Sequence, residues 1–389
     1  MSTPRCPISR SALAWAVAVL SATVLVSGCA AASTQPSGSV PVAASLGNAG
    51  SPASSQSSSH APAASGSEAT AVLAGESWIV FQRWTRATGP RLRLIRTDGS
   101  GDHEVLPKRL GDQQHPDWSP DGEHVAFVDN VSIWVVDADG SNAREVAPCV
   151  APCLWLDTPA WSPDGRSIAF IRQDLVDGHS PGSDIQAVDP ATGVVRTLLT
   201  TVGPEYASYV RWSPDGHSLV IELDRYPDTK ADTSTVTAEA VAVVDLRAAE
   251  PTARLLTDWK MFATYPDWSW ANDRVVFSTY DLGFRDFKDL KDVRPPSDLY
   301  TINPDGTGLT QLTHNPHGAL LVRSDTASGP LSTQPSWAPD GRSIIFTKVD
   351  GPDWPGWSMA TIRADGSALA SATGAEVVLG THPRLRPTP

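Results

Sequence analysis

The segment His115-Pro-Asp-Trp118-Ser-Pro-Asp-Gly122 decides the fold, because close copies of it recur along the chain. The copies are Pro159-Ala-Trp161-Ser-Pro-Asp-Gly165, Val210-Arg-Trp212-Ser-Pro-Asp-Gly216, Pro335-Ser-Trp337-Ala-Pro-Asp-Gly341 and a degenerate version, Pro266-Asp-Trp268-Ser-Trp-Ala-Asn-Asp273. Proline at the second position of Ser-Pro-Asp-Gly suits a type I turn, and the final glycine tolerates positive φ. An apolar run such as Val125–Val128 or Ile168–Ile171 follows each copy. The repeat therefore predicts a strand, a tight turn and a second strand.

A second repeated pattern ends in Asp-Gly and completes the structural unit. It occurs at Leu92–Gly99, Ile133–Gly140, Leu299–Gly306 and Met359–Gly366. Asp-Gly is typical of the tight turns that join antiparallel strands. Together the two patterns predict a four-stranded antiparallel meander, and a period of about 50 residues is typical of a β-propeller. The flat tryptophan before the first turn suits the space between packed sheets.

The two ends of the folded region complete one another. Thr381–Pro387 carries the His-Pro of the first repeat but no tryptophan, and no second strand follows it. Ser77–Phe81 reads as a second strand that lacks its first strand. Adding this shared blade to the five tryptophan-bearing repeats gives six blades. The sequence thus predicts an all-β fold, a six-bladed β-propeller over residues 77–389 that is closed by pairing of its N- and C-terminal strands.

These repeats resemble the TolB-type (WD40-like) propeller repeat, whose signature is Trp-Ser-Pro-Asp-Gly followed by an Ile-Ala-Phe-like strand. The resemblance spans residues 77–389 and includes four good copies in register. It implies a periplasmic or cell-surface propeller of the kind that serves as a protein-binding platform or precedes a serine-peptidase domain. One architecture hosts many functions, so the resemblance does not fix the activity.

Residues 1–28 have the features of a bacterial lipoprotein signal peptide. Two arginines precede an apolar run from Ser11 to Val26, which is too short for a typical transmembrane helix. The run ends in Val26-Ser-Gly-Cys29, which resembles a lipobox, whose cysteine is acylated; an ordinary signal peptide with an incidental cysteine is the alternative. Residues 29–76 are rich in Ser, Ala, Gly and Pro, so we expect a lipidated Cys29 followed by a flexible tether.

Cys149 and Cys153 are the cysteines that remain once Cys6 leaves with the signal peptide and Cys29 is lipidated. In an oxidising compartment outside the cytoplasm, a disulfide that closes this small loop is the first expectation. A metal pair would need two further ligands nearby, and none stands out in the sequence.

The charge balance excludes one class of partner. The chain has 30 Lys and Arg against 43 Asp and Glu, a formal net charge of −13, whereas a nucleic-acid groove needs a basic stripe. Much of the acid lies in Asp-Gly turns, where aspartate suits the turn itself, and an acidic patch for a basic partner is the alternative. Hydrophobic residues make up 41% of the chain, enough for a real core. We expect a monomeric propeller without a cofactor.

Strand parity separates the two ends of the propeller. The two repeated turns lie at one end, and the long irregular loops lie at the other end, which we call the long-loop face. Its segments include residues 148–158, 173–183, 224–239, 258–264, 280–298 and 315–334. Variable loops on a rigid scaffold are the usual place for binding. Seven aromatic residues on this face are predicted to contact a partner, with packing of the loops onto the blades as the alternative for each: Trp155, Tyr226, Trp259, Phe262, Phe284, Phe287 and Trp354.

Two enzymatic alternatives have weaker support. Ser358 lies in a Gly-Trp-Ser-Met-Ala segment that looks like a nucleophile elbow, but only about 30 residues follow it, too few for the rest of a hydrolase sheet. The second alternative is a metal site at the channel mouth, where these residues are expected to converge: Gln114, His115, Thr158, Tyr209, Tyr265, Gln334 and His382. Of these, His115, Gln334 and His382 are the candidate ligands, but two histidines are few for a transition metal. Asp137–Asn142 resembles a calcium loop but lacks the later glutamate.

The sequence therefore favours a non-catalytic protein that is exported, anchored by lipid to the cell membrane and exposed to the periplasm or the cell exterior. Its propeller is predicted to be a scaffold that binds another envelope or cell-surface protein, or a glycan, without metal or cofactor. The alternative is a propeller enzyme, a metal-assisted polysaccharide lyase or hydrolase with its site at the channel mouth.

Overall fold

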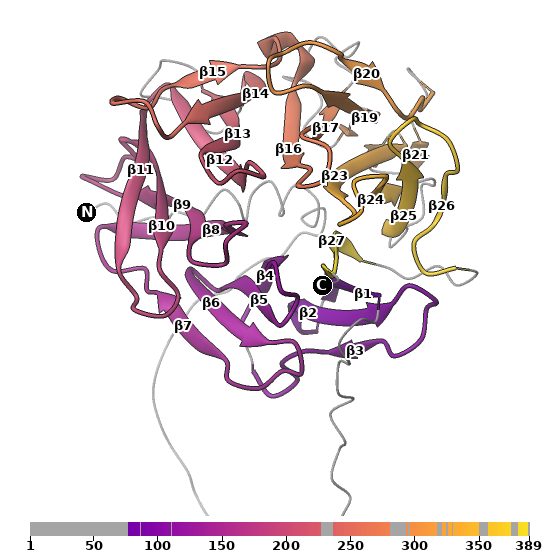
Figure 1. The fold of residues 1–389 in the computed structure, drawn as a ribbon, viewed down its shortest axis with the longest axis horizontal. Coiled ribbons are helices and arrows are strands. Elements are labelled where there is room, and N and C mark those ends of the chain that lie inside the picture. The colour runs from indigo at the N-terminus through magenta and orange to yellow at the C-terminus, as the bar shows by residue number, and fades with distance from the viewer. Residues whose placement is uncertain are drawn as a thin grey trace, which may run out of the picture. The chain divides into compact units, whose positions relative to one another are not determined.

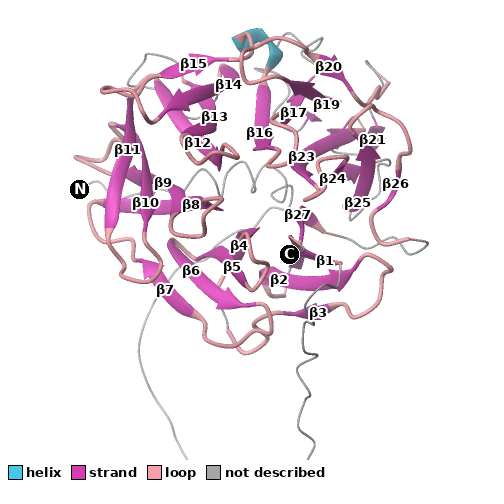
Figure 2. Cartoon of the chain, viewed as in Figure 1, coloured by secondary structure: helices cyan, strands magenta, loops and turns pink. Residues whose placement is uncertain are grey.

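The computed structural model describes residues 77–85, 87–109, 111–226, 236–280, 293–294, 296–316, 321–323, 326–328, 330–349, 357–374 and 380–387. Over these residues the chain consists of β-strands and one short 3-10 helix, η1 (Trp259–Met261), as Figure 2 shows. The predicted all-β class is therefore confirmed. The predicted signal peptide and tether, including Cys29, lie outside the described residues. In the described part, no helix has both the length and the apolar character needed to span a membrane.

Four sheets of the ring in Figure 1 have four antiparallel strands each. The first contains β27 (Thr381–Leu385), β1 (Trp78–Thr85), β2 (Gly89–Arg96) and β3 (His103–Glu104). The second contains β4 (Gln113–Trp118), β5 (His124–Asp129), β6 (Ser132–Asp137) and β7 (Arg144–Ala147). The third contains β8 (Cys153–Trp161), β9 (Ile168–Asp174), β10 (Gly182–Val188) and β11 (Val195–Val202). The fourth contains β12 (Glu205–Trp212), β13 (Ser218–Arg225), β14 (Ala238–Asp245) and β15 (Ala253–Leu255).

The remaining strands form one larger sheet and one small sheet. One half of the larger sheet is the meander β16 (Ala263–Trp268), β17 (Val275–Tyr280), β19 (Ser297–Ile302) and β20 (Thr310–Gln311). Its other half is the meander β23 (Leu331–Trp337), β24 (Ser343–Val349), β25 (Trp357–Arg363) and β26 (Ala370–Ser371). The small sheet contains β18 (Val293–Arg294), β22 (Thr326–Ser328) and β21 (Leu321–Arg323). The predicted β-propeller arrangement is confirmed.

The first and last strands of the described chain share a sheet. β27 pairs antiparallel with β1, with Ile79 opposite Leu385. The indole Nε1 of Trp118, on β4, donates a hydrogen bond to the carbonyl oxygen of Arg384 over 3.2 Å. The last strand therefore contacts both its own sheet and the β4–β7 sheet, and the predicted pairing of the terminal strands is present.

The tryptophans of the repeat fill the space between neighbouring sheets. Trp118, Trp161, Trp212, Trp268 and Trp337 are each at most 6% exposed. Trp212 packs in a cluster with Ala169 and Ile185 of the adjacent sheet, and its Nε1 donates to the carbonyl oxygen of Ala160 over 3.1 Å. Burying such a large apolar side chain is a main source of stability, so each repeat supplies its own contact to the sheet before it.

The Ser-Pro-Asp-Gly turns form as predicted. Gly122 has a φ of 70°, and its amide donates to the carbonyl oxygen of Ser119 over 2.8 Å. A Cβ atom at position 122 would lie 2.7 Å from the carbonyl oxygen of Pro387, so glycine is required here for space as well as for φ.

A shared bulge in the first strand of each meander places one residue in the left-handed region. His115, Thr158, Tyr265, Gln334 and His382 each precede a proline and have φ between 48° and 54°. In β4, β8, β16 and β23 the pairing register shifts at this residue. Positive φ is uncommon outside glycine, so its recurrence in five strands makes the bulge a property of the repeat.

Candidate functional site

Side chains from different sheets meet where the first strands bulge. The position three residues before the repeat tryptophan, with His382 in the last strand, defines an axial set: His115, Thr158, Tyr209, Tyr265, Gln334 and His382. The ring centroids of His115 and His382 are 4.6 Å apart, those of His382 and Tyr265 are 5.9 Å apart, and those of Tyr265 and Tyr209 are 5.6 Å apart. These four residues come from β4, β27, β16 and β12, so the convergence expected at the channel mouth is present for them.

Two of the three candidate metal ligands in the axial set, Gln334 and His115, already use a possible ligand atom to bond other protein groups. Gln334 Oε1 accepts hydrogen bonds from the backbone N–H of His382 over 3.2 Å and from Thr347 Oγ1 over 2.9 Å. His115 Nδ1 pairs with the carboxylate of Asp157. A metal held by these three side chains would have to compete with the bonds at Gln334 Oε1 and His115 Nδ1.

Two residues beyond the axial set, the same strands carry a buried network of two arginines and two aspartates. Arg384 Nη1 lies 2.7 Å from Asp267 Oδ1, and Arg211 Nε lies 3.5 Å from the same oxygen. Arg384 Nε lies 3.7 Å from Asp117 Oδ1. Burial holds the pKa of His382 well below its usual value, and the charges of Arg384 and Arg211 add to this shift. Two arginines and two aspartates therefore link four first strands with balanced charge. The positive charge of the arginines disfavours a further cation beside His382.

A second buried polar group lies in the β12–β15 sheet. Glu222 and Asp224 on β13 and Glu239 on β14 bring carboxylate oxygens within 4.8 Å of one another, and we call them the acidic cluster. Glu222 Oε2 accepts a hydrogen bond from the backbone N–H of Tyr265 over 2.6 Å. Burial, reinforced by neighbouring carboxylates, raises the pKa of Glu222 and of Glu239 well above the usual range. Burial raises the pKa of Asp224 to about 6.

On the long-loop face, two of the predicted partner-binding aromatics lie beside an arginine. The guanidinium carbon of Arg225 is 3.9 Å from the ring centroid of Trp259, and Arg225 Nη2 donates to Glu205 Oε1 over 2.6 Å. The rings of Tyr226 and Tyr206 meet edge to face with centroids 5.1 Å apart. These contacts form an aromatic–arginine cluster, defined as Tyr206, Arg225, Tyr226 and Trp259. It combines flat apolar surface with polar groups, as interface hot spots do.

The other predicted partner-binding residues have different surroundings. Trp155 is 8% exposed and belongs to the core between two sheets, so its side chain offers little surface to a partner. Phe262 is half-buried and ends η1 with a φ of 47°. Phe284, Phe287 and Trp354 lie outside the described residues.

Four valines on the long-loop face are unusually exposed. They are Val131 (41%), Val150 (63%), Val176 (47%) and Val202 (71%). Val131, Val150 and Val176 lie on connections from a second to a third strand or from a fourth strand to the next first strand, the type of connection that makes up this face, and Val202 ends β11 next to such a connection. Val194 (65%), Leu309 (47%) and Leu369 (50%) are comparably exposed at the opposite end, so exposure of single apolar residues does not by itself distinguish the two ends.

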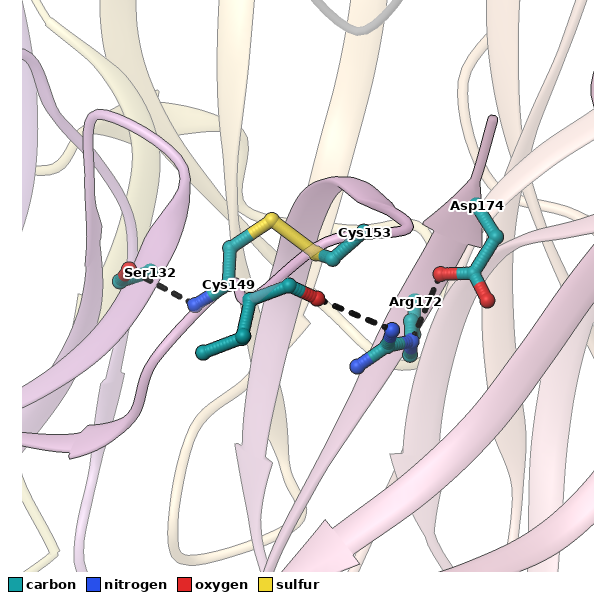
Figure 3. The surroundings of a disulfide bond; sticks show 6 residues. Ser132, Cys149, Cys153, Arg172 and Asp174 are labelled. Atoms are coloured by element: carbon teal, nitrogen blue, oxygen red, sulfur yellow. Dashed lines mark hydrogen bonds and ion pairs between the residues drawn. A yellow bond between two sulfur atoms is a disulfide. The ribbon is translucent and has the colours of Figure 1, made fainter. Parts of the chain in front are cut away.

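The disulfide predicted between Cys149 and Cys153 is present, with Cα atoms 5.4 Å apart. Figure 3 shows its surroundings. The backbone N–H of Cys149 donates to Ser132 Oγ over 3.1 Å, and Arg172 Nη2 donates to the carbonyl oxygen of Val150 over 3.3 Å. The covalent loop is thus held between two sheets, with Val150 exposed on it.

The structure explains two segments that resemble functional motifs, the one around Ser358 and Asp137–Asn142, as ordinary elements of the repeat. Ser358 lies inside β25, and its hydroxyl donates to the carbonyl oxygen of Lys348 over 3.2 Å, so it is part of a regular strand and not of a strand-to-helix turn. Asp137 accepts hydrogen bonds from Asn142 Nδ2 over 2.7 Å and from Ser141 Oγ over 3.2 Å, which closes a hairpin turn. Neither segment forms the site that its motif resembles.

Both buried polar groups, the axial network of Arg211, Arg384, Asp117 and Asp267 and the acidic cluster, lie outside the sites predicted from the sequence. A signal for the acidic cluster was present in Glu222-Leu223-Asp224, where acids alternate inside a strand that is otherwise apolar. A signal for the axial network was the charged residue directly before the tryptophan in several repeats, such as Asp117 and Asp267. Neither signal identifies the neighbouring groups, because Glu239 meets Asp224 only through the pairing of β13 with β14, and the axial aspartates meet arginines from other sheets.

Comparison with solved structures identifies relatives of the fold. TolB from Acinetobacter baumannii aligns with a TM-score of 0.55 at 16% identity, over 80% of this chain and 66% of that chain. A putative TolB from Agrobacterium tumefaciens aligns with a TM-score of 0.51 at 17% identity, over 78% of this chain and 90% of that chain. A propeller in a nidogen–laminin complex aligns with a TM-score of 0.50 at 11% identity, over 76% of this chain and 92% of that chain.

Sequence comparison adds no closer relative. No protein-family model matches the chain, and no curated protein matches it at a significant level. The present chain spans about two thirds of the length of the Acinetobacter protein. The structural alignments show a common fold, and at identities this low function has to be argued from the site. The repeats, the sheet arrangement and these alignments together show that the chain has a TolB-type β-propeller fold.

Proposed function

We propose that this chain is an exported lipoprotein whose propeller has six blades and serves as a protein-binding scaffold in the cell envelope. The lipid anchor is supported by the apolar segment that ends in Val26-Ser-Gly-Cys29. The scaffold role is supported by the difference between the two ends of the propeller, of which one has short repeated turns and the other has longer irregular connections and the aromatic–arginine cluster.

The count of six blades is supported by the strand pairing inside the larger sheet. Its two meanders are each antiparallel, and a single parallel pair, Ser297 with Leu331, joins them. Treating the two meanders as separate blades gives six units, each with one of the six first strands β4, β8, β12, β16, β23 and β27. The parallel pair is then a contact between neighbouring blades.

The observation that carries the scaffold role is the aromatic–arginine cluster together with the four exposed valines. Val150 and Val176 are exposed on hydrogen-bonded loops, and Trp259 stacks on Arg225 at the same end of the fold. A partner that covers such a surface removes apolar area from water, which favours affinity. One structural neighbour is a chain in a nidogen–laminin complex, which is consistent with this use of the architecture.

Photo-crosslinking in cells that naturally produce the chain tests the scaffold role. A benzophenone amino acid replaces Val150 (63% exposed) or Val176 (47%) on the long-loop face, and Val194 (65%) or Leu309 (47%) on the opposite end as matched controls. We expect one common adduct from the first pair and none from the second. The adduct should disappear in a Trp259→Ala/Tyr226→Ala background. Equal labelling from both ends, or an adduct that persists in that background, would refute the proposal.

Substitution of Cys29 tests the anchor. In Cys29→Ser the full chain is expected to move from the membrane fraction to the soluble fraction, because no acyl chain remains to insert into the bilayer. Cys6→Ser, within the predicted signal peptide, is the matched control and should stay with the membrane. Membrane association of Cys29→Ser equal to that of the parent would contradict the lipoprotein assignment.

The second candidate function is a metal-assisted polysaccharide lyase or hydrolase at the channel mouth. It is favoured by the proximity of His115, His382 and Gln334. The partners of Gln334 Oε1 and His115 Nδ1 and the positive charge of Arg384 count against it. A His115→Ala/His382→Ala variant separates the two functions, because a scaffold keeps its partner and an enzyme loses its metal.

A further inference from the structure

The acidic cluster is built by strand geometry. Glu222 and Asp224 are two residues apart on β13, so their side chains leave the same face of the sheet. Glu239 lies directly opposite Asp224 in the antiparallel register of β13 and β14. The three carboxylates therefore come together because of the sheet itself, and their oxygens lie within 4.8 Å of one another.

One oxygen of the cluster lacks the partner that burial requires. Asp224 is 9% exposed, and its Oδ1 atom is out of contact with solvent. Within the described residues, no donor makes a hydrogen bond to this atom. A buried acceptor without a donor costs free energy comparable to a lost hydrogen bond, so such atoms call for a ligand.

Two other buried acids, Asp267 and Asp157, have cationic or imidazole partners that the acidic cluster lacks in the described part of the chain. Asp267 has Arg384 at 2.7 Å and Arg211 at 3.5 Å, and Asp157 is paired with His115. Among the described residues, no Lys, Arg or His makes an ion pair with any member of the acidic cluster. Besides burial, the pKa values of its carboxyl groups are shifted by the neighbouring acids and by the hydroxyls of Ser208 and Tyr226.

We propose that Glu222, Asp224 and Glu239 form a binding site for a hard divalent cation of the calcium class. Every donor in the cluster is an oxygen, which is the ligand that Ca²⁺ takes in proteins, and three carboxylates leave a net charge of −1 around the ion. Asp224 Oδ1 gains its missing partner as a ligand. Soft or imidazole-preferring metals find no sulfur or nitrogen donor within this cluster. This inference does not depend on the scaffold function.

Metal titration of the full chain tests the proposal. After chelator treatment, Ca²⁺ at about 100 times its dissociation constant is expected to raise the midpoint of thermal unfolding by about 4 °C. Terbium, used as a luminescent substitute, should be sensitised by excitation of the tyrosines, because Tyr226 and Tyr265 lie beside the cluster. In Glu222→Gln/Glu239→Gln both signals should be lost.

Matched variants locate the ion. Asp121, Glu123 and His124 form a second acidic group with similar spacing on an exposed turn, so Asp121→Asn/Glu123→Gln is the control and should keep both signals. His115→Ala/His382→Ala should keep them too. If the double glutamine variant does not fold, Asp224→Asn is used and should weaken terbium binding at least tenfold. The proposal is overturned if Ca²⁺, Mg²⁺ and Mn²⁺ all leave the parent unchanged, or if either control variant loses the response.

Discussion

Removal of residues 381–389 is expected to abolish cooperative unfolding of the propeller. β27 supplies the strand beside β1, and without it β1 exposes a row of unpaired backbone groups. The deletion also removes Arg384, which neutralises Asp267, and the Trp118 indole loses its acceptor. The truncated chain should unfold without a single sharp transition in urea, followed by tryptophan fluorescence, and should elute as aggregates in size exclusion.

Supplying the missing strand separately provides the control. A synthetic peptide of residues 381–389 can pair with β1 as β27 does, so it should restore a cooperative transition to the truncated chain. A peptide with the same composition in scrambled order should not restore it. A truncated chain that unfolds at the same urea concentration as the parent would show that the ring does not need its terminal strand.

Asp267→Ala is expected to destabilise the protein by about 3–5 kcal/mol, because it leaves two buried arginines without their shared carboxylate. Asp267 Oδ1 lies 2.7 Å from Arg384 and 3.5 Å from Arg211, and Asp267 Oδ2 accepts from the backbone N–H of Trp337 over 2.7 Å. The side chains of these charged residues are at most 9% exposed, so water cannot replace the lost charge. The free energy of unfolding in urea measures the effect.

Asp245→Ala is the matched control for Asp267→Ala. Asp245 also pairs with an arginine, Arg247, at 3.0 Å, but their side chains are 50% and 61% exposed. Solvent screens that pair, so its loss should leave the urea midpoint almost unchanged. Equal destabilisation by the two substitutions would mean that the axial network does not behave as a buried group. A double variant, Asp267→Leu/Arg384→Met, should recover part of the stability that Asp267→Ala loses.

Much of the fold could be predicted from the sequence because each repeat contains turn motifs that indicate where its strands begin and end. The Trp-Ser-Pro-Asp-Gly turns and the Asp-Gly turns are local features that turn chemistry determines. The pairing of Ser77–Phe81 with Thr381–Pro387 follows from the repeat count, because each end lacks the strand that the other end supplies. The Cys149–Cys153 disulfide was equally predictable, because the two cysteines are only four positions apart in the sequence and therefore stay close in space. The larger sheet was not foreseen, since its parallel contact between Ser297 and Leu331 joins segments outside the repeat.

The site was less predictable than the fold. Trp155 was expected to lie on a loop and face a partner, but β8 begins at Cys153 and includes it, so its side chain packs in the core between two sheets. Tyr226 and Trp259 are held in a cluster with Arg225 that no spacing in the sequence reveals. The charge network needs pairs such as Asp117 with Arg384, which are brought together only when the ring closes.

At the axis, the residue before proline has the same backbone conformation in five first strands but a different side chain in most of them. Five first strands hold imidazole, hydroxyl, phenol or carboxamide side chains at this position with nearly the same φ. The bulge recurs whichever of these groups is present, so it belongs to the backbone pattern that the repeats share. Single substitutions can therefore change which chemical groups line the axis, one blade at a time, while the backbone bulge is retained. An architecture of this kind can acquire new specificities by point mutation and does not have to evolve a new loop for each of them.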